Sequence, residues 1–145
     1  FGVIVNKPAA IDLSALFTAD FELPNLELPV LLGGPVEQEH LYFLHSTERQ
    51  YPQTVSVNSE ISLTTSREIL DDLSKPCAIE YVLPLLGYAG WRAGQLEFEL
   101  KQGAWLIAPF AKEIVFSTPY SERTTRAAQQ IGIDLNLLIN DLNEH

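Results

Sequence analysis

Short runs and alternations of apolar residues along the chain predict five β-strands. The predicted strands span residues 2–6, 30–32, 41–45, 56–65 and 78–87. Pro84 lies inside the last run, and because proline cannot donate to a strand ladder, it predicts a sheet edge or a bulge there. Two further runs, at 105–108 and 113–116, predict a final pair of strands.

Apolar residues spaced three or four apart predict helices elsewhere in the chain. Residues 11–17 predict one or two helical turns, and residues 18–29 predict an acidic loop. A helix is predicted between Ser66, which can cap its start, and Pro76, which ends it. Further helices are predicted to begin at Pro119 and to cover residues 135–142.

Residues 95–101 fit two periodicities. With a period of two, Leu96, Phe98 and Leu100 share a face, whereas with a helical period Phe98 leaves that face. The segment consists of good helix formers, and Gly103 provides a left-handed stop, so we predict a helix. Strands and helices are mixed without a strict βα repeat, which predicts an α+β fold in a single compact domain over residues 1–145.

The composition is typical of a folded cytoplasmic protein. The chain has 145 residues, 46% of them hydrophobic and 19% charged, and a single cysteine. No apolar run approaches the roughly 18 residues that span a bilayer, and no secretory signal is present, so we expect no membrane association. The chain has no methionine and opens directly on an apolar run, so we expect that an N-terminal segment precedes it in the native protein.

The charge of the chain argues against nucleic-acid binding. Nine Lys and Arg residues stand against nineteen Asp and Glu residues, which gives a net charge of −10. Affinity for DNA or RNA comes mainly from clustered cations that neutralise phosphates. We therefore expect no direct nucleic-acid binding.

The residues that most often perform chemistry are few and scattered. Cys77 has no histidine near it in the sequence, so a buried, inert thiol is the favoured interpretation. His40 and His45 are five residues apart on a predicted strand, where their side chains point to opposite faces, and His145 is terminal. We predict no metal site, no cofactor and no catalytic residue.

A glycine-rich segment, residues 87–94, is the strongest candidate for binding a ligand. It leads from a predicted strand into a predicted helix, and backbone N–H groups at such a junction, beside Arg92, can hold an anion. Its spacing matches neither phosphate-binding fingerprint, so a structural role is favoured over ligand binding. The candidate ligand-binding residues are Trp91, Arg92 and Gln95, with His45 as a polar neighbour. The glycines of Gly33-Gly34-Pro35 predict a turn with positive φ or a close backbone approach.

Several segments in this order resemble the bacterial UPF0301 family, also called the YqgE/AlgH family. They are Gly2-Val-Ile-Val-Asn-Lys-Pro8, Gly33-Gly-Pro-Val36, Leu44-His45-Ser46, Ser62-Leu-Thr-Thr65, Gly87-Tyr-Ala-Gly-Trp-Arg-Ala-Gly-Gln-Leu-Glu97 and Ala104-Trp-Leu106. The resemblance implies an α+β fold with a curved, barrel-like mixed sheet and flanking helices, a cytoplasmic setting, and a further N-terminal strand-loop-strand segment. It implies no agreed catalytic residues and no established biochemical function.

The favoured function is a non-enzymatic binding or interaction module with a regulatory role, whose protein partner or small-molecule ligand is unknown. One alternative is a small-molecule or anion-binding enzyme that uses the Gly87 to Gly94 loop. A second alternative is a transcriptional regulator that acts through a protein partner, because the most basic predicted helix, around Arg123 and Arg126, carries too few cations to read DNA directly.

Overall fold

The computed structural model describes residues 1–17, 28–75 and 78–137. The chain divides into two compact units, Phe1–Gly90 and Trp91–His145, and each is described by itself. The α+β class and the mixed sheet predicted from the sequence are confirmed. A single domain over all 145 residues stays a prediction.

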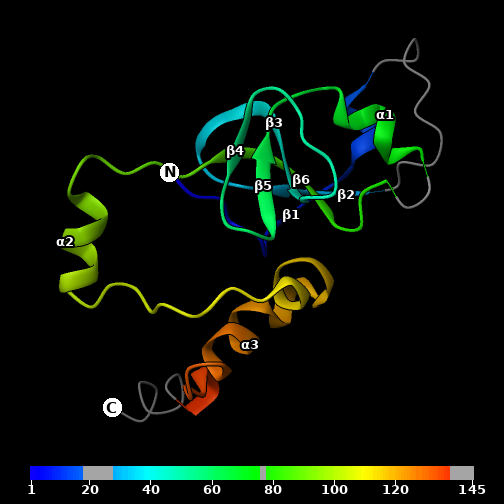
Figure 1. The fold of residues 1–145 in the computed structure, drawn as a ribbon. Coiled ribbons are helices and arrows are strands. Elements are labelled where there is room, and N and C mark those ends of the chain that lie inside the picture. Colours follow the sequence, from blue (N-terminus) through cyan, green and yellow to red (C-terminus); the bar gives the residue numbers. More distant parts are fainter. Residues whose placement is uncertain (18–27, 76–77, 138–145) are drawn as a thin grey trace. The chain divides into compact units, whose positions relative to one another are not determined.

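Unit 1 is built on one open, six-stranded sheet (Figure 1). The strands are β1 (Pro8–Asp12), β2 (Pro29–Leu32), β3 (Val36–Ser46), β4 (Thr54–Ser56), β5 (Ile61–Thr64) and β6 (Val82–Tyr88). Their order across the sheet is β1-β2-β6-β3-β5-β4. The β2–β6 pair is parallel and every other pair is antiparallel, so the sheet is mixed.

One cluster of buried apolar side chains lies against one face of this sheet. Side chains alternate along β3, so Leu41, Phe43 and His45 share a face. The short helix α1 (Ile69–Leu73) and the 3-10 turn η1 (Leu13–Leu16) bring apolar side chains to the same core. The buried members of the cluster are Leu13, Val30, Phe43, Tyr51, Ile69 and Leu70.

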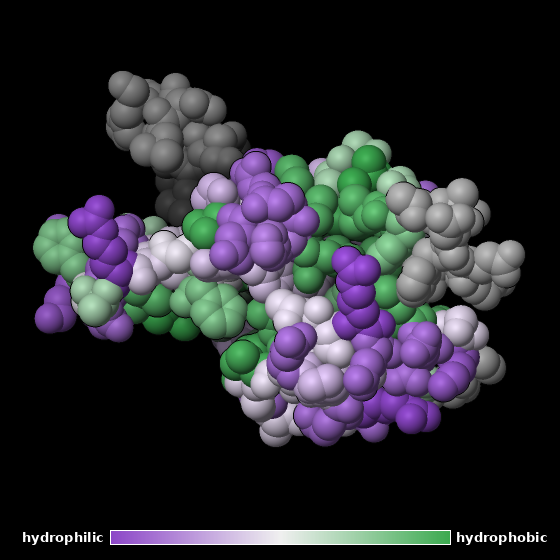
Figure 2. Space-filling view, turned by 90° about the horizontal axis from the view of Figure 1, so that it is seen from above, coloured by the Kyte–Doolittle hydropathy of each residue, from purple (hydrophilic) through white to green (hydrophobic). Residues whose placement is uncertain are grey.

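Other apolar side chains of unit 1 remain on the surface. Val55 and Val57, at the β4 edge of the sheet, are 52% and 54% exposed. Figure 2 shows apolar and polar residues interleaved on the visible face of the protein. Scattered exposed apolar residues of this kind are normal in folded proteins.

Three glycines allow β2 and β6 to end close together. A Cβ atom on Gly34 would overlap the backbone of Tyr88, and one on Gly33 would overlap the carbonyl oxygen of Gly87. Gly87 itself has a φ of +75°, which favours glycine. The close backbone approach predicted for Gly33 and Gly34 is therefore confirmed.

Unit 2 contains helices and connecting segments. They are α2 (Gln95–Lys101), the π-helical turn η2 (Glu113–Ser117), the 3-10 turn η3 (Tyr120–Glu122) and α3 (Arg123–Gln129). The helix predicted at 95–101 is confirmed, and its first and last residues are the predicted ones. It ends in a Schellman motif, in which Gly103 N–H donates to the carbonyl of Leu100 and Ala104 N–H to that of Glu99, at 3.1 and 3.0 Å.

Four predictions about strands are wrong or need correction. Residues 105–108 are irregular and residues 113–117 form η2, so the final strand pair is absent from the described chain. Residues 56–65 are not one strand: β4 ends at Ser56 and β5 begins at Ile61, because the Asn58 side chain accepts the N–H groups of Glu60 and Ile61 where the chain reverses. Residues 2–6 contain one isolated bridge, from Gly2 to Ala89.

The strand around Pro84 is the fourth correction. β6 lies inside the sheet, between β2 and β3, rather than at an edge. The pairing between β6 and β2 begins at Leu85, one residue past Pro84. The proline therefore precedes the hydrogen-bond ladder with β2 and does not interrupt it.

The helices predicted after Ser66 and after Pro119 are present. Ser66 accepts the N–H of Glu68 at 3.3 Å in the turn before α1, whose cap is Glu68, so α1 starts two residues later than predicted. The last predicted helix begins at residues 135–137, where Asp134 accepts the N–H of Asn136. The acidic loop over 18–27, the stop at Pro76, Cys77, the rest of the last helix and His145 lie outside the described residues.

Candidate functional site

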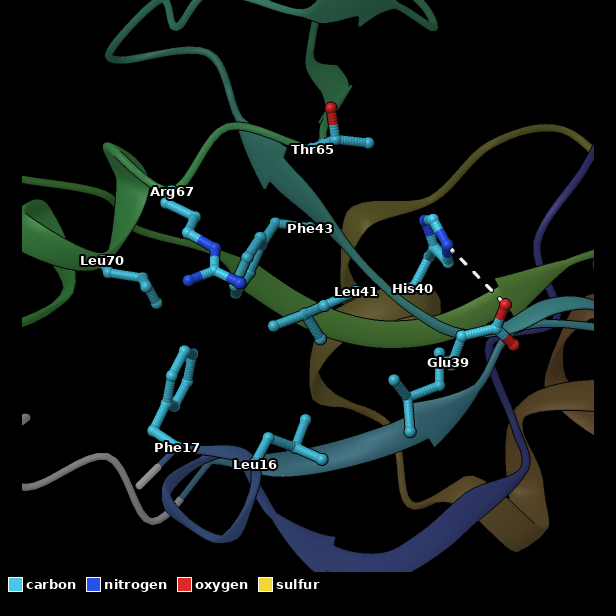
Figure 3. Close-up of a pocket in the computed structure, with 10 residues that line it drawn as sticks. Leu16, Phe17, Glu39, His40, Leu41, Phe43, Thr65, Arg67 and Leu70 are labelled. Atoms are coloured by element: carbon cyan, nitrogen blue, oxygen red, sulfur yellow. Dashed lines mark ion pairs between the residues drawn. The ribbon is translucent and has the colours of Figure 1, made fainter. Parts of the chain in front are cut away.

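A cavity of about 430 Å³ opens in unit 1 beside strand β3 (Figure 3). Its volume is in the range of small-molecule sites, which is roughly 300 to 1,000 Å³. The lining comes from β3 and β6, from the end of η1, from the connection between β5 and α1, and from α1 itself. The lining residues are Leu16, Phe17, Glu39, His40, Leu41, Phe43, Thr65, Arg67, Leu70 and Leu86.

The floor of the cavity is apolar and continuous with the core. Phe43 and Leu70 are 2% and 1% exposed, and both belong to the core cluster. Leu41 lies two residues before Phe43 on the same face of β3, and it is paired in register with Leu86 of β6. The sheet pairing therefore places two half-buried leucines side by side on the floor.

The rim of the cavity carries its polar groups. Thr65 and Arg67 lie on the turn between β5 and α1, which is held by the N–H of Ser66 donating to Thr64 Oγ1 at 3.0 Å. His40 Nε2 lies 3.7 Å from Glu39 Oε1 on β3. Figure 3 shows the Arg67 side chain extending from its turn into the space beside Leu70 and Leu41.

Arg67 differs from the other cations around α1. Lys75 Nζ and Arg49 Nε lie 3.5 and 3.7 Å from the carboxylate of Asp72. The Arg67 guanidinium has no ion pair or hydrogen bond within residues 1–17, 28–75 and 78–137. Arg67 is therefore a cationic group of the cavity without a counter-ion among the described residues.

A buried hydrogen bond fixes helix α1 beneath this rim. Tyr51 Oη donates to Asp72 Oδ2 at 2.6 Å, and both side chains are nearly inaccessible to solvent. This bond, with the nearby cations, lowers the pKa of Asp72 below its ordinary value. Burial, reinforced by the bond to Asp72, raises the pKa of Tyr51.

His45, one of the residues proposed from the sequence, lies in β3 and does not line the cavity. Its ring is fully buried, and Nδ1 lies 2.8 Å from the Ser46 carbonyl oxygen, so Nδ1 carries the hydrogen. The Ser46 hydroxyl donates to Glu48 at 2.6 Å, and no bond joins it to the imidazole. His45 Nε2 has no hydrogen-bond partner in the described part of the chain.

The other three candidates lie together in unit 2. The Gln95 side chain accepts the N–H of Arg92 at 3.0 Å, immediately before α2. Trp91 Nε1 donates to Glu99 Oε2 at 2.9 Å, and Trp105 Nε1 donates to the same oxygen at 3.3 Å. These contacts give the segment a structural explanation, because they tie the loop to the helix.

The sequence analysis missed Arg67 and the cavity. The one feature of the sequence that could have indicated Arg67 is its place as a single cation between a predicted strand and a predicted helix with an apolar face. The floor comes from residues far apart in the sequence, such as Phe17, Phe43 and Leu86, which no spacing rule groups.

No cluster of three His, Cys, Asp or Glu side chains that could hold a metal occurs among the described residues. The described helices include none with the length and apolar character needed to cross a membrane.

Comparisons with known proteins give a consistent result. A protein-family model described as AlgH-like matches residues 1–136. A UPF0301 protein of Nitrosococcus oceani is 39% identical over 145 residues, which cover 97% of this chain and 78% of the relative. A UPF0301 protein of Coxiella burnetii is 40% identical over 141 residues, or 94% and 75% of the two chains.

Two solved structures are also similar. The solution structure of the AlgH protein from Pseudomonas aeruginosa has a TM-score of 0.76 at 33% identity, covering 94% of this chain and 75% of that one. A crystal structure from Corynebacterium diphtheriae has a TM-score of 0.66 at 15% identity, covering 86% and 68%, and shows similarity of fold.

Proposed function

The chain belongs to the AlgH-like family of UPF0301 proteins, and we propose that it is a binding module whose small-molecule ligand occupies the cavity of unit 1. The observation that carries the proposal is the division of the lining into an apolar floor that is continuous with the core and a polar rim. Sites for small molecules typically combine apolar walls with a few polar groups that fix the ligand's orientation.

The floor can supply the affinity that a small ligand needs. Covering about 100 Å² of apolar ligand surface contributes roughly 2.5 kcal/mol before the cost of immobilising the ligand. Phe43 and Leu70 are already fixed by core packing, so the protein spends little conformational entropy in presenting them. The site is thus preorganised on its apolar side.

An NMR titration of the full chain with 4-phenylbutan-1-ol, a neutral amphiphile, tests the proposal. We expect chemical-shift changes at the amides of β3 around Leu41 and Phe43 and on the turn around Arg67. Leu41→Trp fills the cavity and should abolish these changes. Val57→Trp, a change of the same kind at an exposed position outside the cavity, should leave them intact.

The proposal is wrong if wild-type shifts are absent up to about 10 mM alcohol, a fragment-level affinity, or if they map outside the lining residues. It is also wrong if a folded Leu41→Trp variant binds as well as wild type. Should that variant not fold, the position of the wild-type shifts decides the question by itself.

A further inference from the structure

We infer that the cavity of unit 1 selects amphipathic monoanions: Arg67 binds a carboxylate while the apolar body of the ligand lies on the floor against the half-buried Leu41 and Leu86. This inference deepens the proposed function and rests on it. It adds the chemical class of the ligand and the residue that recognises it.

The guanidinium of Arg67 has the charge that an anion requires. Arg67 is the cation on the rim of the cavity, and the described chain provides its guanidinium with no carboxylate or carbonyl partner. By contrast, Arg49 and Lys75 share the carboxylate of Asp72. A guanidinium carries donors in a planar fork that matches a carboxylate with two parallel hydrogen bonds.

That charge also lies beside apolar side chains. Leu70 is one turn beyond Arg67 on the same segment and is 1% exposed. A ligand whose body covers the floor also removes water from the guanidinium, which strengthens its attraction to an anion. Binding of the apolar body and binding of the anionic group therefore reinforce each other.

Thr65 carries a second donor on the rim of the cavity. Both residues line the cavity, two positions apart in the turn between β5 and α1. The Thr65 hydroxyl has no hydrogen bond within the part of the chain that the structure describes. It is a second polar group on the rim, at a distance from the Arg67 guanidinium (Figure 3).

The remaining rim charges restrict the class of anion. Glu39 lines the cavity beside His40 and carries a negative charge into the rim. The whole chain has a net charge of −10, which repels a dianion more strongly than a monoanion. These charges favour a carboxylate with an apolar tail over a phosphate ester.

The test compares two probes that differ only in the charged group: 4-phenylbutyrate and 4-phenylbutan-1-ol. Each is titrated by NMR into wild type and into Arg67→Gln, Arg67→Lys, Glu39→Gln and Arg92→Gln. The last variant is the matched control, because it removes an arginine from the glycine-rich segment that the sequence analysis singled out for anions.

Wild type should bind phenylbutyrate more tightly than the alcohol. Arg67→Gln should weaken phenylbutyrate binding by about tenfold. This is the lower end of the range of affinity losses expected when a hydrogen bond to a charged group is removed, because the Arg67 side chain is exposed. The same variant should change binding of the alcohol by less than about twofold, since a neutral head group gains little from a cation. Arg67→Lys should recover part of the loss, and Arg92→Gln should bind both probes as wild type does. Glu39→Gln should tighten binding of phenylbutyrate alone.

Each alternative outcome is distinct. Two outcomes would overturn the inference about anions and leave the proposed function intact. In the first, the alcohol binds in the cavity and phenylbutyrate binds no better; in the second, Arg67→Gln weakens binding of both probes equally. If Arg92→Gln abolishes phenylbutyrate binding, the anion binds at the glycine-rich segment and the inference is overturned. If neither probe binds, the proposed function itself fails.

Discussion

Replacing Asp72 by asparagine tests whether the charge of one buried carboxylate holds helix α1 in place. The Asp72 side chain is 9% exposed and accepts the Tyr51 hydroxyl at 2.6 Å. Asparagine keeps the shape and one acceptor oxygen, so the variant removes the charge and leaves the packing. Helix α1 carries Leu70 and follows Arg67, so this bond also supports the cavity.

The expected loss of stability can be estimated from the contacts. A hydrogen bond to a charged group contributes about 1.5 to 3 kcal/mol, against roughly 1 kcal/mol for a neutral one. The pairs with Arg49 and Lys75 involve side chains that are 53% and 60% exposed, and pairs of this kind contribute about 0.5 kcal/mol each or less. We therefore expect Asp72→Asn to lower the free energy of unfolding by about 2 kcal/mol at pH 7.

The effect should depend on pH in a defined direction. The pKa of Asp72 is lowered in the folded protein, so the carboxylate stabilises the fold fully above the unfolded-state pKa, near 4. This contribution is lost as the pH falls through the lower folded-state pKa. The difference between wild type and Asp72→Asn should be constant above about pH 5 and should shrink below pH 4.

Urea unfolding followed by circular dichroism at pH 7, 5 and 3 measures this difference. Asp71→Asn is the matched control: it makes the same change of charge on the next residue of α1, which is exposed, and should cost about 0.5 kcal/mol or less. Equal stability of wild type and Asp72→Asn at pH 7, or a difference that persists unchanged at pH 3, would refute the reasoning.

Three further substitutions test other parts of the fold. Gly34→Ala places a Cβ on the backbone of Tyr88 and should cost more than about 3 kcal/mol in urea unfolding; a loss below about 1 kcal/mol would contradict the close approach. Gly103→Ala, at a φ of +73°, should lower the free energy of unfolding by about 1 kcal/mol, whereas an unchanged midpoint would exclude strain there. Glu99→Gln should shift the emission of both tryptophans, which donate to this carboxylate, while Glu97→Gln should leave the spectrum unchanged.

Local signals predicted some elements accurately. Helix α2 is set by residues within its own span and by the Gly103 stop, so its bounds could be read from the sequence alone. The run at 113–116 has the β-branched residues of a strand, but strand preference depends on having a neighbour to pair with. Without such a pairing, the Thr118 N–H donates to the Glu113 carbonyl at 2.9 Å and closes a π-helical turn.

Long-range pairing explains the other differences. Proline has no N–H to donate, so Pro84 by itself predicts a sheet edge or a bulge. The pairing with β2 starts one residue beyond it, and β6 can therefore lie inside the sheet. No feature of the local sequence specifies that register. Trp91, Arg92 and Gln95 are neighbours in the chain, and the contacts of Trp91 with Glu99 and of Arg92 with Gln95 are those of a folded junction; their role in binding a ligand stays a prediction.

The cavity shows why a binding site can escape motif analysis while its supports do not. The Thr64 hydroxyl accepts the Ser66 N–H, the Ser66 hydroxyl accepts the Glu68 N–H, and these local bonds fix the turn that carries Arg67. Burial of Leu70 and the bond of Asp72 to Tyr51 then fix the helix that follows. The guanidinium of Arg67 makes no hydrogen bond or ion pair with a described residue. An exposed, unpaired positive charge adds little to the stability of the fold, so we propose that Arg67 contributes to binding an anion rather than to packing.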